Sequence, residues 1–227
     1  MDSLKRRARM AGLLYLILAI TSIIGLVYVP SKIIIKNDFS TTVTNIKNFE
    51  MLFRMGILSN LIYLIVFVFL VLSFYNLFKE VDKKLSIIMV TLVIVAIPIA
   101  FVNQTIQAAV LNIINNENFI KTFNTKQVVS IIQLFLNLYE HGNYAVMIFW
   151  GLWLFPLGLL IIKSKFIPKI FGILLIFGCF GYLVPSFTYI ISPYYGKFIF
   201  PISTIPSAVA EILIILWLLI KGIKDQN

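Results

Sequence analysis

The sequence predicts an all-α integral membrane protein, a bundle of six transmembrane helices with both termini in the cytoplasm. Three observations carry this prediction. Of the 227 residues, 60% are hydrophobic and only 12% are charged, and the mean hydropathy is +0.99, whereas about 25% of the residues in a soluble domain are charged. The apolar residues form six long runs, and the basic residues fall mainly in the gaps between these runs. Because no linker or low-complexity segment interrupts the pattern, we treat residues 1–227 as one domain.

The first half of the chain contains three of the expected helices. The first is predicted at residues 11–29, after a basic N-terminal segment. Its apolar run is too long for a typical signal core and lacks a clear cleavage site, so we expect an uncleaved helix that ends at Pro30. A polar loop, residues 32–50, separates it from the second helix at 51–78, which a charged segment stops. The third helix is predicted at 85–114, where Pro98 favours a kink.

The fourth helix is predicted at residues 144–162. These nineteen uncharged residues would span about 28 Å as an α-helix, close to the thickness of bilayer hydrocarbon. Pro156 lies inside this run, and Lys163 closes it. A periodic apolar stretch at 127–139 precedes it. That stretch is either a helical leg continuous with the fourth helix or a short interfacial helix broken at Gly142.

The last two helices are predicted at residues 167–191 and 204–220. The intervening segment Ser192–Ser203 contains two prolines, a glycine and a pair of tyrosines, and this composition is typical of a turn-rich loop.

The distribution of Lys and Arg predicts the orientation of the helices. Twelve basic residues lie in the two terminal segments and in the loops that share their side of the membrane, while six lie on the other side. Cytoplasmic loops carry the excess of Lys and Arg, so we expect both termini in the cytoplasm and the protein in the plasma membrane. An even number of helices requires the termini to share a side, which agrees with this assignment.

Composition also excludes several classes of function. The net charge of +10 is spread over the loops and is not gathered on one face, so we expect no nucleic-acid binding. One histidine and one cysteine, Cys179, are too few for an ordinary zinc site. The sequence contains no GxSxG, HExxH or P-loop motif. We therefore expect no metal and no cofactor.

Several polar residues within or beside the apolar runs are the candidate ligand-binding residues. A rise of 1.5 Å per residue places most of them at one depth, near the outer interface. Glu211 differs, because it lies ten residues before Lys221, about 15 Å from that end and near the midplane. The full candidate set is Arg54, Asn103, Gln104, Gln107, Glu140, His141 and Glu211.

Each candidate also has a plainer interpretation. Glu50 and Arg54 are spaced i, i+4 and can form a surface ion pair. The amides of helix three can act as hydrogen-bonding glue between helices. His141 can be an ordinary interfacial histidine that faces water. A charged Glu211 at mid-bilayer would cost about 2.5–3.5 kcal/mol, so we expect it to face other helices, protonated or paired.

Five stretches together resemble an uncharacterised prokaryotic membrane family, domain of unknown function 4386. They span nearly the whole chain, and the most specific is Phe149-Trp-Gly-Leu-Trp-Leu-Phe-Pro-Leu-Gly158. The others are residues 8–16, 52–56, 166–175 and 216–222. The resemblance implies a multi-pass membrane protein, and it brings no activity, ligand or catalytic residue with it.

Three functions fit the sequence. The leading hypothesis is a non-enzymatic protein that binds or moves a small amphiphilic or lipid-like molecule near the outer leaflet. In that hypothesis Arg54, Gln107 and His141 line one pocket for an anionic head group, and membrane lipid is the expected partner. The first alternative is a membrane-embedded enzyme that uses Glu140, His141 and Glu211 as acid–base groups. The second is a structural or accessory subunit without a ligand.

Overall fold

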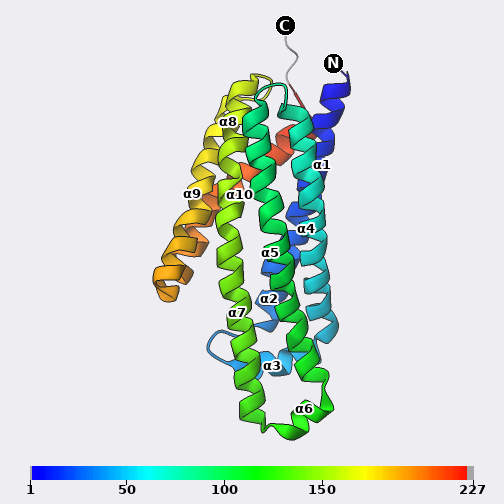
Figure 1. Cartoon of the computed structure of the whole chain (residues 1–227), viewed down its shortest axis with the longest axis vertical. Coiled ribbons are helices and arrows are strands. Elements are labelled where there is room, and N and C mark those ends of the chain that lie inside the picture. Colours follow the sequence, from blue (N-terminus) through cyan, green and yellow to red (C-terminus); the bar gives the residue numbers. More distant parts are fainter. Residues whose placement is uncertain (1, 224–227) are drawn as a thin grey trace. The chain divides into compact units, whose positions relative to one another are not determined.

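The computed structural model describes residues 2–223 as helices joined by short connections, and it shows no strand in that range (Figure 1). The fold is all-α, as predicted. The elements are α1 (Asp2–Ile23), η1 (Ile24–Tyr28), α2 (Val29–Ile33), α3 (Phe39–Asn48), α4 (Glu50–Phe78), α5 (Lys83–Asn115), α6 (Glu117–Thr122), α7 (Thr125–Leu152), α8 (Leu154–Ser164), α9 (Lys169–Ile191) and α10 (Pro193–Ile220).

Within residues 2–223, six helical segments are long and apolar enough to cross a membrane, which confirms the predicted number of spans. They are Leu4–Ile33, Glu50–Phe78, Lys83–Asn115, Thr125–Ser164, Lys169–Ile191 and Pro193–Ile220. Lys224, which contributes to the predicted charge bias, lies outside the described residues.

The chain divides into two compact units, which we describe separately. Unit 1 contains the segments Met1–Ile17, Val66–Pro98 and Tyr144–Asn227. Residues 1 and 224–227 of these segments lie outside the described residues. Unit 2 contains Leu18–Ile65 and Ile99–Asn143.

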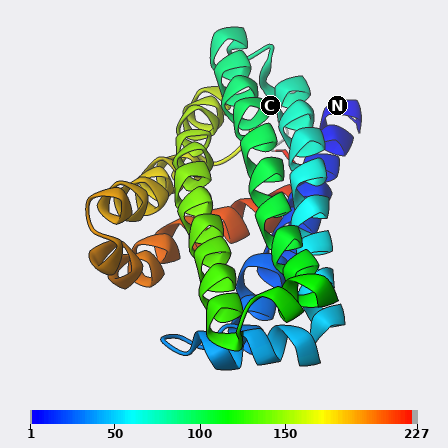
Figure 2. The same ribbon diagram turned by 60° about the horizontal axis from the view of Figure 1, so that its bottom comes forward.

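In unit 1, α9 packs along both α8 and α10, and Figure 2 shows α9 and α10 as an antiparallel pair in orange and red. Gly158 of α8 and Gly172 of α9 allow the close approach, because a Cβ on Gly158 would lie 2.6 Å from the carbonyl oxygen of Gly172. The side chains of Tyr15, Phe74 and Trp153 form an aromatic core, with ring centroids 5.8–6.3 Å apart.

In unit 2, α3 and α6 lie at the same end of the unit (Figure 1). The apolar core there is built from five helices. Its buried members include Val29 and Ile33 of α2, Ile46 of α3, Phe53 of α4, Val110, Leu111 and Ile114 of α5, and Val128, Ile132 and Leu136 of α7. A polar side chain begins each short helix: Asp38 accepts from the Thr41 N–H at 2.9 Å, and Asn116 accepts from the Phe119 N–H at 3.0 Å. Asp and Asn are favoured at this position because they satisfy the exposed N–H groups of the first turn.

Asp82 links α5 to α8 within unit 1. Its carboxylate accepts a hydrogen bond from the Leu85 N–H at 3.1 Å, at the start of α5, and another from Lys163 Nζ at 2.7 Å. The hydrogen bond from Lys163, with the backbone N–H second, holds the pKa of Asp82 below its ordinary value.

The structure corrects the predicted end of the first helix. We expected Pro30 to terminate it, yet the helix continues to Ile33. The five residues Ile24–Tyr28 form a π-helical turn that ends two residues before Pro30, and the Val29 N–H bonds to the Ile24 carbonyl. Proline clashes with the carbonyl four residues earlier. A wider turn at this point relieves that clash, so the helix passes through the proline.

Two further expectations are resolved by helix continuity. The stretch 127–139 is continuous with the fourth span, since α7 runs through Gly142 to Leu152. The interruption comes at Trp153, because Pro156 has no N–H to bond the Leu152 carbonyl. The prediction of a loop at Ser192–Ser203 was wrong. In the structure α10 begins at Pro193, because proline is favoured in the first turn of a helix.

Candidate functional site

The predicted site residues divide between the two units. Arg54, Asn103, Gln104, Gln107, Glu140 and His141 belong to unit 2, and Glu211 belongs to unit 1. The structure brings some of them into hydrogen-bonded groups and leaves others with local partners.

Arg54 is held by its neighbour on α4. Its Nη2 and Nε atoms lie 2.6 Å and 2.7 Å from Glu50 Oε1, and half of the Arg54 side chain is exposed. This is the surface ion pair that the i, i+4 spacing allows. Exposed pairs of this kind contribute about 0–1 kcal/mol to stability. Arg54 therefore has a simple structural role, whatever else it binds.

A cluster of amides in unit 2 connects three helices. Asn60 of α4 donates from Nδ2 to Gln104 Oε1 of α5 at 3.1 Å and to Tyr139 Oη of α7 at 3.3 Å. Asn103 of α5 donates from Nδ2 to the Tyr139 carbonyl at 3.0 Å and to Asn143 Oδ1 at 2.9 Å. We call these five residues the amide cluster. All except Asn143 are buried.

Two glycines make room for the cluster. A Cβ on Gly25 of the π-helical turn would overlap Oδ1 of Asn60, and one on Gly142 of α7 would overlap Oδ1 of Asn103. Each amide therefore lies directly on the backbone of a neighbouring helix. Small residues at helix contacts and amides that bond across them are typical of membrane proteins.

Hydrogen bonding in this region is incomplete. Asn60 is fully buried, and its Oδ1 has no hydrogen-bond partner among the described residues. Gln107 lies one helical turn after Asn103 on α5 and is only 5% exposed. Its side-chain amide makes no hydrogen bond to any described residue. Buried polar groups in native proteins are nearly always paired, so the enclosed, unpaired Oδ1 atom of Asn60 requires an explanation.

His141 and Glu140 lie next to each other on α7. The exposed His141 bonds through Nδ1 to the Asn137 carbonyl in its own helix at 2.7 Å. Because a carbonyl only accepts, Nδ1 carries the proton and Nε2 is the acceptor in the neutral ring. Glu140 is half-buried. This local geometry neither assembles nor excludes the predicted pocket of Arg54, Gln107 and His141, which stays a prediction.

Glu211 of α10 has two tyrosine partners in unit 1. Tyr15 Oη of α1 donates to Oε2 at 2.7 Å, and Tyr182 Oη of α9 donates to Oε1 at 2.8 Å. Both distances are typical of O–H···O hydrogen bonds. No described Lys, Arg or His forms an ion pair with Glu211. The carboxylate is thus hydrogen-bonded by neutral donors, without a counter-charge.

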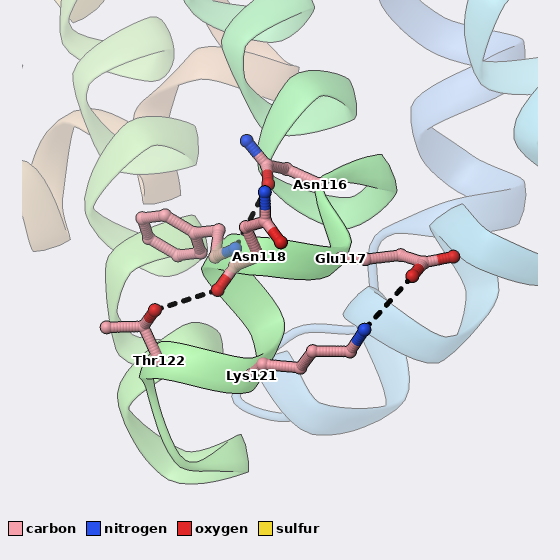
Figure 3. Close-up of polar contacts among 6 residues, drawn as sticks. Asn116, Glu117, Asn118, Lys121 and Thr122 are labelled. Atoms are coloured by element: carbon pink, nitrogen blue, oxygen red, sulfur yellow. Dashed lines mark hydrogen bonds and ion pairs between the residues drawn. The ribbon is translucent and has the colours of Figure 1, made fainter.

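Two surface hollows lie at the α6 end of unit 2. The larger, about 670 Å³, is open and lined by Asn112, Asn115, Asn116, Glu117 and Asn118. Figure 3 shows polar contacts of some of these residues: Glu117 pairs with Lys121 at 3.3 Å, and Thr122 donates to the Asn118 carbonyl at 2.8 Å. The smaller hollow is lined by residues 123–131. Neither hollow includes a predicted site residue, and these contacts join residues four apart within α6.

Sequence reasoning missed five residues that complete these groups: Asn60, Tyr139 and Asn143 in the amide cluster, and Tyr15 and Tyr182 around Glu211. Asn60 offers a signal, since it is one of two amides in the apolar run of α4 and lies well inside that run, whereas Asn76 lies near its end. The tyrosines offer little signal, because tyrosine is common in membrane helices and its hydrogen-bond partner depends on helix packing.

Comparison with known proteins identifies a family and no activity. The model of the family described as domain of unknown function DUF4386 matches residues 10–222, nearly the whole chain. No curated protein and no solved structure matches. The six apolar spans agree with the membrane character expected from the resemblance. The chain is therefore a multi-pass membrane protein that belongs to the DUF4386 family.

Proposed function

We propose that this protein is a non-enzymatic membrane protein that binds a small amphiphilic or lipid-like molecule, and that unit 2 holds the polar group of this molecule. One observation carries the proposal: within the described residues, the Oδ1 atom of Asn60 is enclosed without a hydrogen-bond partner in an otherwise paired amide cluster. Gln107, which is 5% exposed and lies one turn after Asn103 of this cluster, forms no hydrogen bond to a described residue. A buried unpaired polar group costs about 1–3 kcal/mol. A ligand that pairs with these groups gains affinity of that order.

The unpaired atoms indicate the chemistry of the ligand. Asn60 Oδ1 is an acceptor and requires a donor, such as a hydroxyl or an amide N–H. Gln107 offers both a donor and an acceptor. This pattern favours a neutral, hydroxyl- or amide-bearing head group over the anionic group that Arg54 suggested. The apolar helix surfaces around the cluster would hold the tail of such a molecule.

The test compares Gln107→Leu with the wild type by native mass spectrometry after purification in lipid nanodiscs. Leucine has nearly the volume of glutamine, and Gln107 makes no hydrogen bond within the described structure, so the variant should fold. Thr105→Val is the matched control, because Thr105 is an exposed residue of the same helix. We expect a co-purified neutral amphiphile on the wild type and on Thr105→Val, and its loss from Gln107→Leu.

Two outcomes would overturn the proposal. One is the absence of any amphiphile on the wild type, which would leave water as the partner of the unpaired amides. The other is equal retention by all three proteins. Either result moves the accessory-subunit hypothesis to first place.

We further propose that the protein lies in the plasma membrane with both termini in the cytoplasm, as the charge bias suggests. Cysteine labelling of intact cells tests this with a membrane-impermeant maleimide. A cysteine introduced at exposed Ser40 should react, whereas one at exposed Lys84 should react only after permeabilisation. The native Cys179 is 2% exposed and should stay unlabelled. Reaction at position 84 but not at 40 in intact cells would reverse the topology.

A further inference from the structure

The carboxylate of Glu211 is held by two tyrosine hydroxyls in the apolar interior of unit 1. It lies on α10, ten residues before Lys221, which corresponds to about 15 Å along the helix axis. Tyr15 of α1 and Tyr182 of α9 each donate to a different carboxylate oxygen. The group therefore connects three helices of unit 1 through a single carboxyl.

Neutral donors satisfy the hydrogen-bonding capacity of a carboxylate without cancelling its charge. An unpaired charge inside a membrane protein is costly, and such residues are rare and face the protein interior. Tyr15 is 1% exposed, and its ring packs against Phe74 and Trp153, which leaves no room for a bulky counter-ion on that side. A proton is the smallest cation, and it neutralises the carboxylate without displacing any of these side chains.

We propose that Glu211, Tyr15 and Tyr182 form a proton-binding site within the membrane-spanning part of unit 1. In the step, a proton from the medium bonds to one carboxylate oxygen, no other covalent bond changes, and the charge of the group goes from −1 to zero. The new O–H then donates to a tyrosine oxygen, because a tyrosine hydroxyl both donates and accepts. The hydrogen bond to that tyrosine reverses its direction, while the other tyrosine continues to donate.

The surroundings make Tyr182 the residue whose hydroxyl turns. Tyr182 is half-buried, whereas Tyr15 is enclosed by aromatic rings. The titratable groups that face Glu211 are Tyr15 from α1 and Tyr182 from α9. Ser207, one turn earlier on α10, donates to the Gly178 carbonyl at 2.6 Å and is thereby occupied. Proton binding at Glu211 thus changes the contact between α9 and α10, and it does so independently of any amphiphile in unit 2.

Infrared difference spectroscopy of the protein in lipid, recorded over the pH range in which it stays folded, tests the site. The variant is Glu211→Gln, which keeps the size and hydrogen bonds of the side chain. The matched control is Glu117→Gln, which removes a surface carboxyl whose side chain is 84% exposed. We expect a carboxylic-acid C=O band that grows as the pH falls, survives in Glu117→Gln and disappears in Glu211→Gln. A tyrosine band should shift over the same pH range.

Tyr182→Phe adds a second readout. It removes one hydroxyl and leaves the packing of the ring in place, and we expect the midpoint of the Glu211 titration to move. The proposal is overturned if Glu211→Gln and wild type give identical spectra, or if the Glu211 band does not change with pH. An unaltered midpoint in Tyr182→Phe would remove the tyrosine from the site.

Discussion

The two units place polar groups inside apolar helices in different ways. Unit 2 uses neutral amides, with Asn60, Asn103 and Gln104 bonding to one another's helices and to α7. Unit 1 uses one carboxylate, Glu211, between two tyrosine hydroxyls. Neutral amides serve as structural links in a membrane without changing charge state. A carboxylate exchanges a proton, so only the group in unit 1 can change charge while its hydrogen bonds persist.

The glycines of the two units also contact different kinds of group. In unit 1, Gly158 and Gly172 bring two backbones together, whereas in unit 2 Gly25 and Gly142 make space for amide side chains. The first arrangement depends on helix–helix packing alone. The second couples packing to hydrogen bonding, so a substitution there affects both.

The largest expected effect comes from placing the wrong charge in unit 1. Glu211→Lys removes the acceptor of two tyrosines and puts an ammonium in its place. Lys at the centre of a membrane helix costs about 2.5–3.5 kcal/mol on insertion scales, and the two hydroxyls lose their partner as well. Thermal unfolding in detergent should show a large loss of stability, while Glu211→Gln stays near wild type. Equal stability of Glu211→Lys and wild type would contradict the interior position of Glu211.

A methyl group at the backbone contact of unit 1 should have the next largest effect. In Gly158→Ala the new Cβ would meet the Gly172 carbonyl oxygen at 2.6 Å, and a backbone atom cannot rotate away. Overpacking of this kind costs about 1–3 kcal/mol. Gly56→Ala in unit 2 is the comparison, because its nearest neighbour is a side-chain methyl of Val29 at 2.8 Å. The unfolding temperature should fall more for Gly158→Ala, and the reverse order would contradict the assigned packing.

A smaller effect, of opposite sign, is expected for Gln107→Leu in unit 2. Gln107 is 5% exposed and forms no hydrogen bond to a described residue, so replacing its amide with an apolar group should raise the free energy of unfolding by about 1 kcal/mol in ligand-free protein. Thr105→Val on the exposed side of α5 should change it by less than about 0.5 kcal/mol. Denaturation of delipidated protein measures both. A clear loss of stability in Gln107→Leu would mean that glutamine is bonded within the protein.

The smallest effect concerns the ion pair of Asp82 and Lys163. The pKa of Asp82 is lowered in the folded state, so its stabilising contribution is present above the ordinary value of 3.8 and is lost as the pH falls through the lowered value. Asp82→Asn should therefore flatten the acid limb of the stability profile, while asparagine still caps α5. The control is Glu80→Gln on the same connection. An unchanged acid limb in Asp82→Asn would show that the pair contributes nothing measurable.

Apolar length and basic boundaries were enough to predict the spans, because a bilayer imposes both. They did not predict the helix at 193–203, since Pro193 and Gly196 are turn formers in isolation. In the structure the proline occupies the first turn, and Gly196 packs on the backbone of Tyr189, where any Cβ would clash. Tertiary contact thus fixes a conformation that composition alone assigns to a loop.

For the candidate site, the spacing of Asn103, Gln104 and Gln107 predicted one polar face of α5, and the structure buries all three. The i, i+4 spacing of Glu50 and Arg54 predicted their pair. The partners of Asn60 and Glu211 lie 79 and 196 residues away in the chain. The local periodicity of a sequence holds no information about contacts at such separations. These partners could therefore be identified only from the structure.

The π-helical turn at Ile24–Tyr28 fixes the helical phase of the residues that come after it. A π turn accommodates one residue more than an α turn, and one residue corresponds to about 100° around the helix. Val29 and Ile33 reach the core of unit 2 with this offset included. If these residues formed a regular α-helix without the loss of a residue, both side chains would turn by about 100° away from the core. The π-helical turn therefore helps to decide which side chains of the first span reach the core of unit 2.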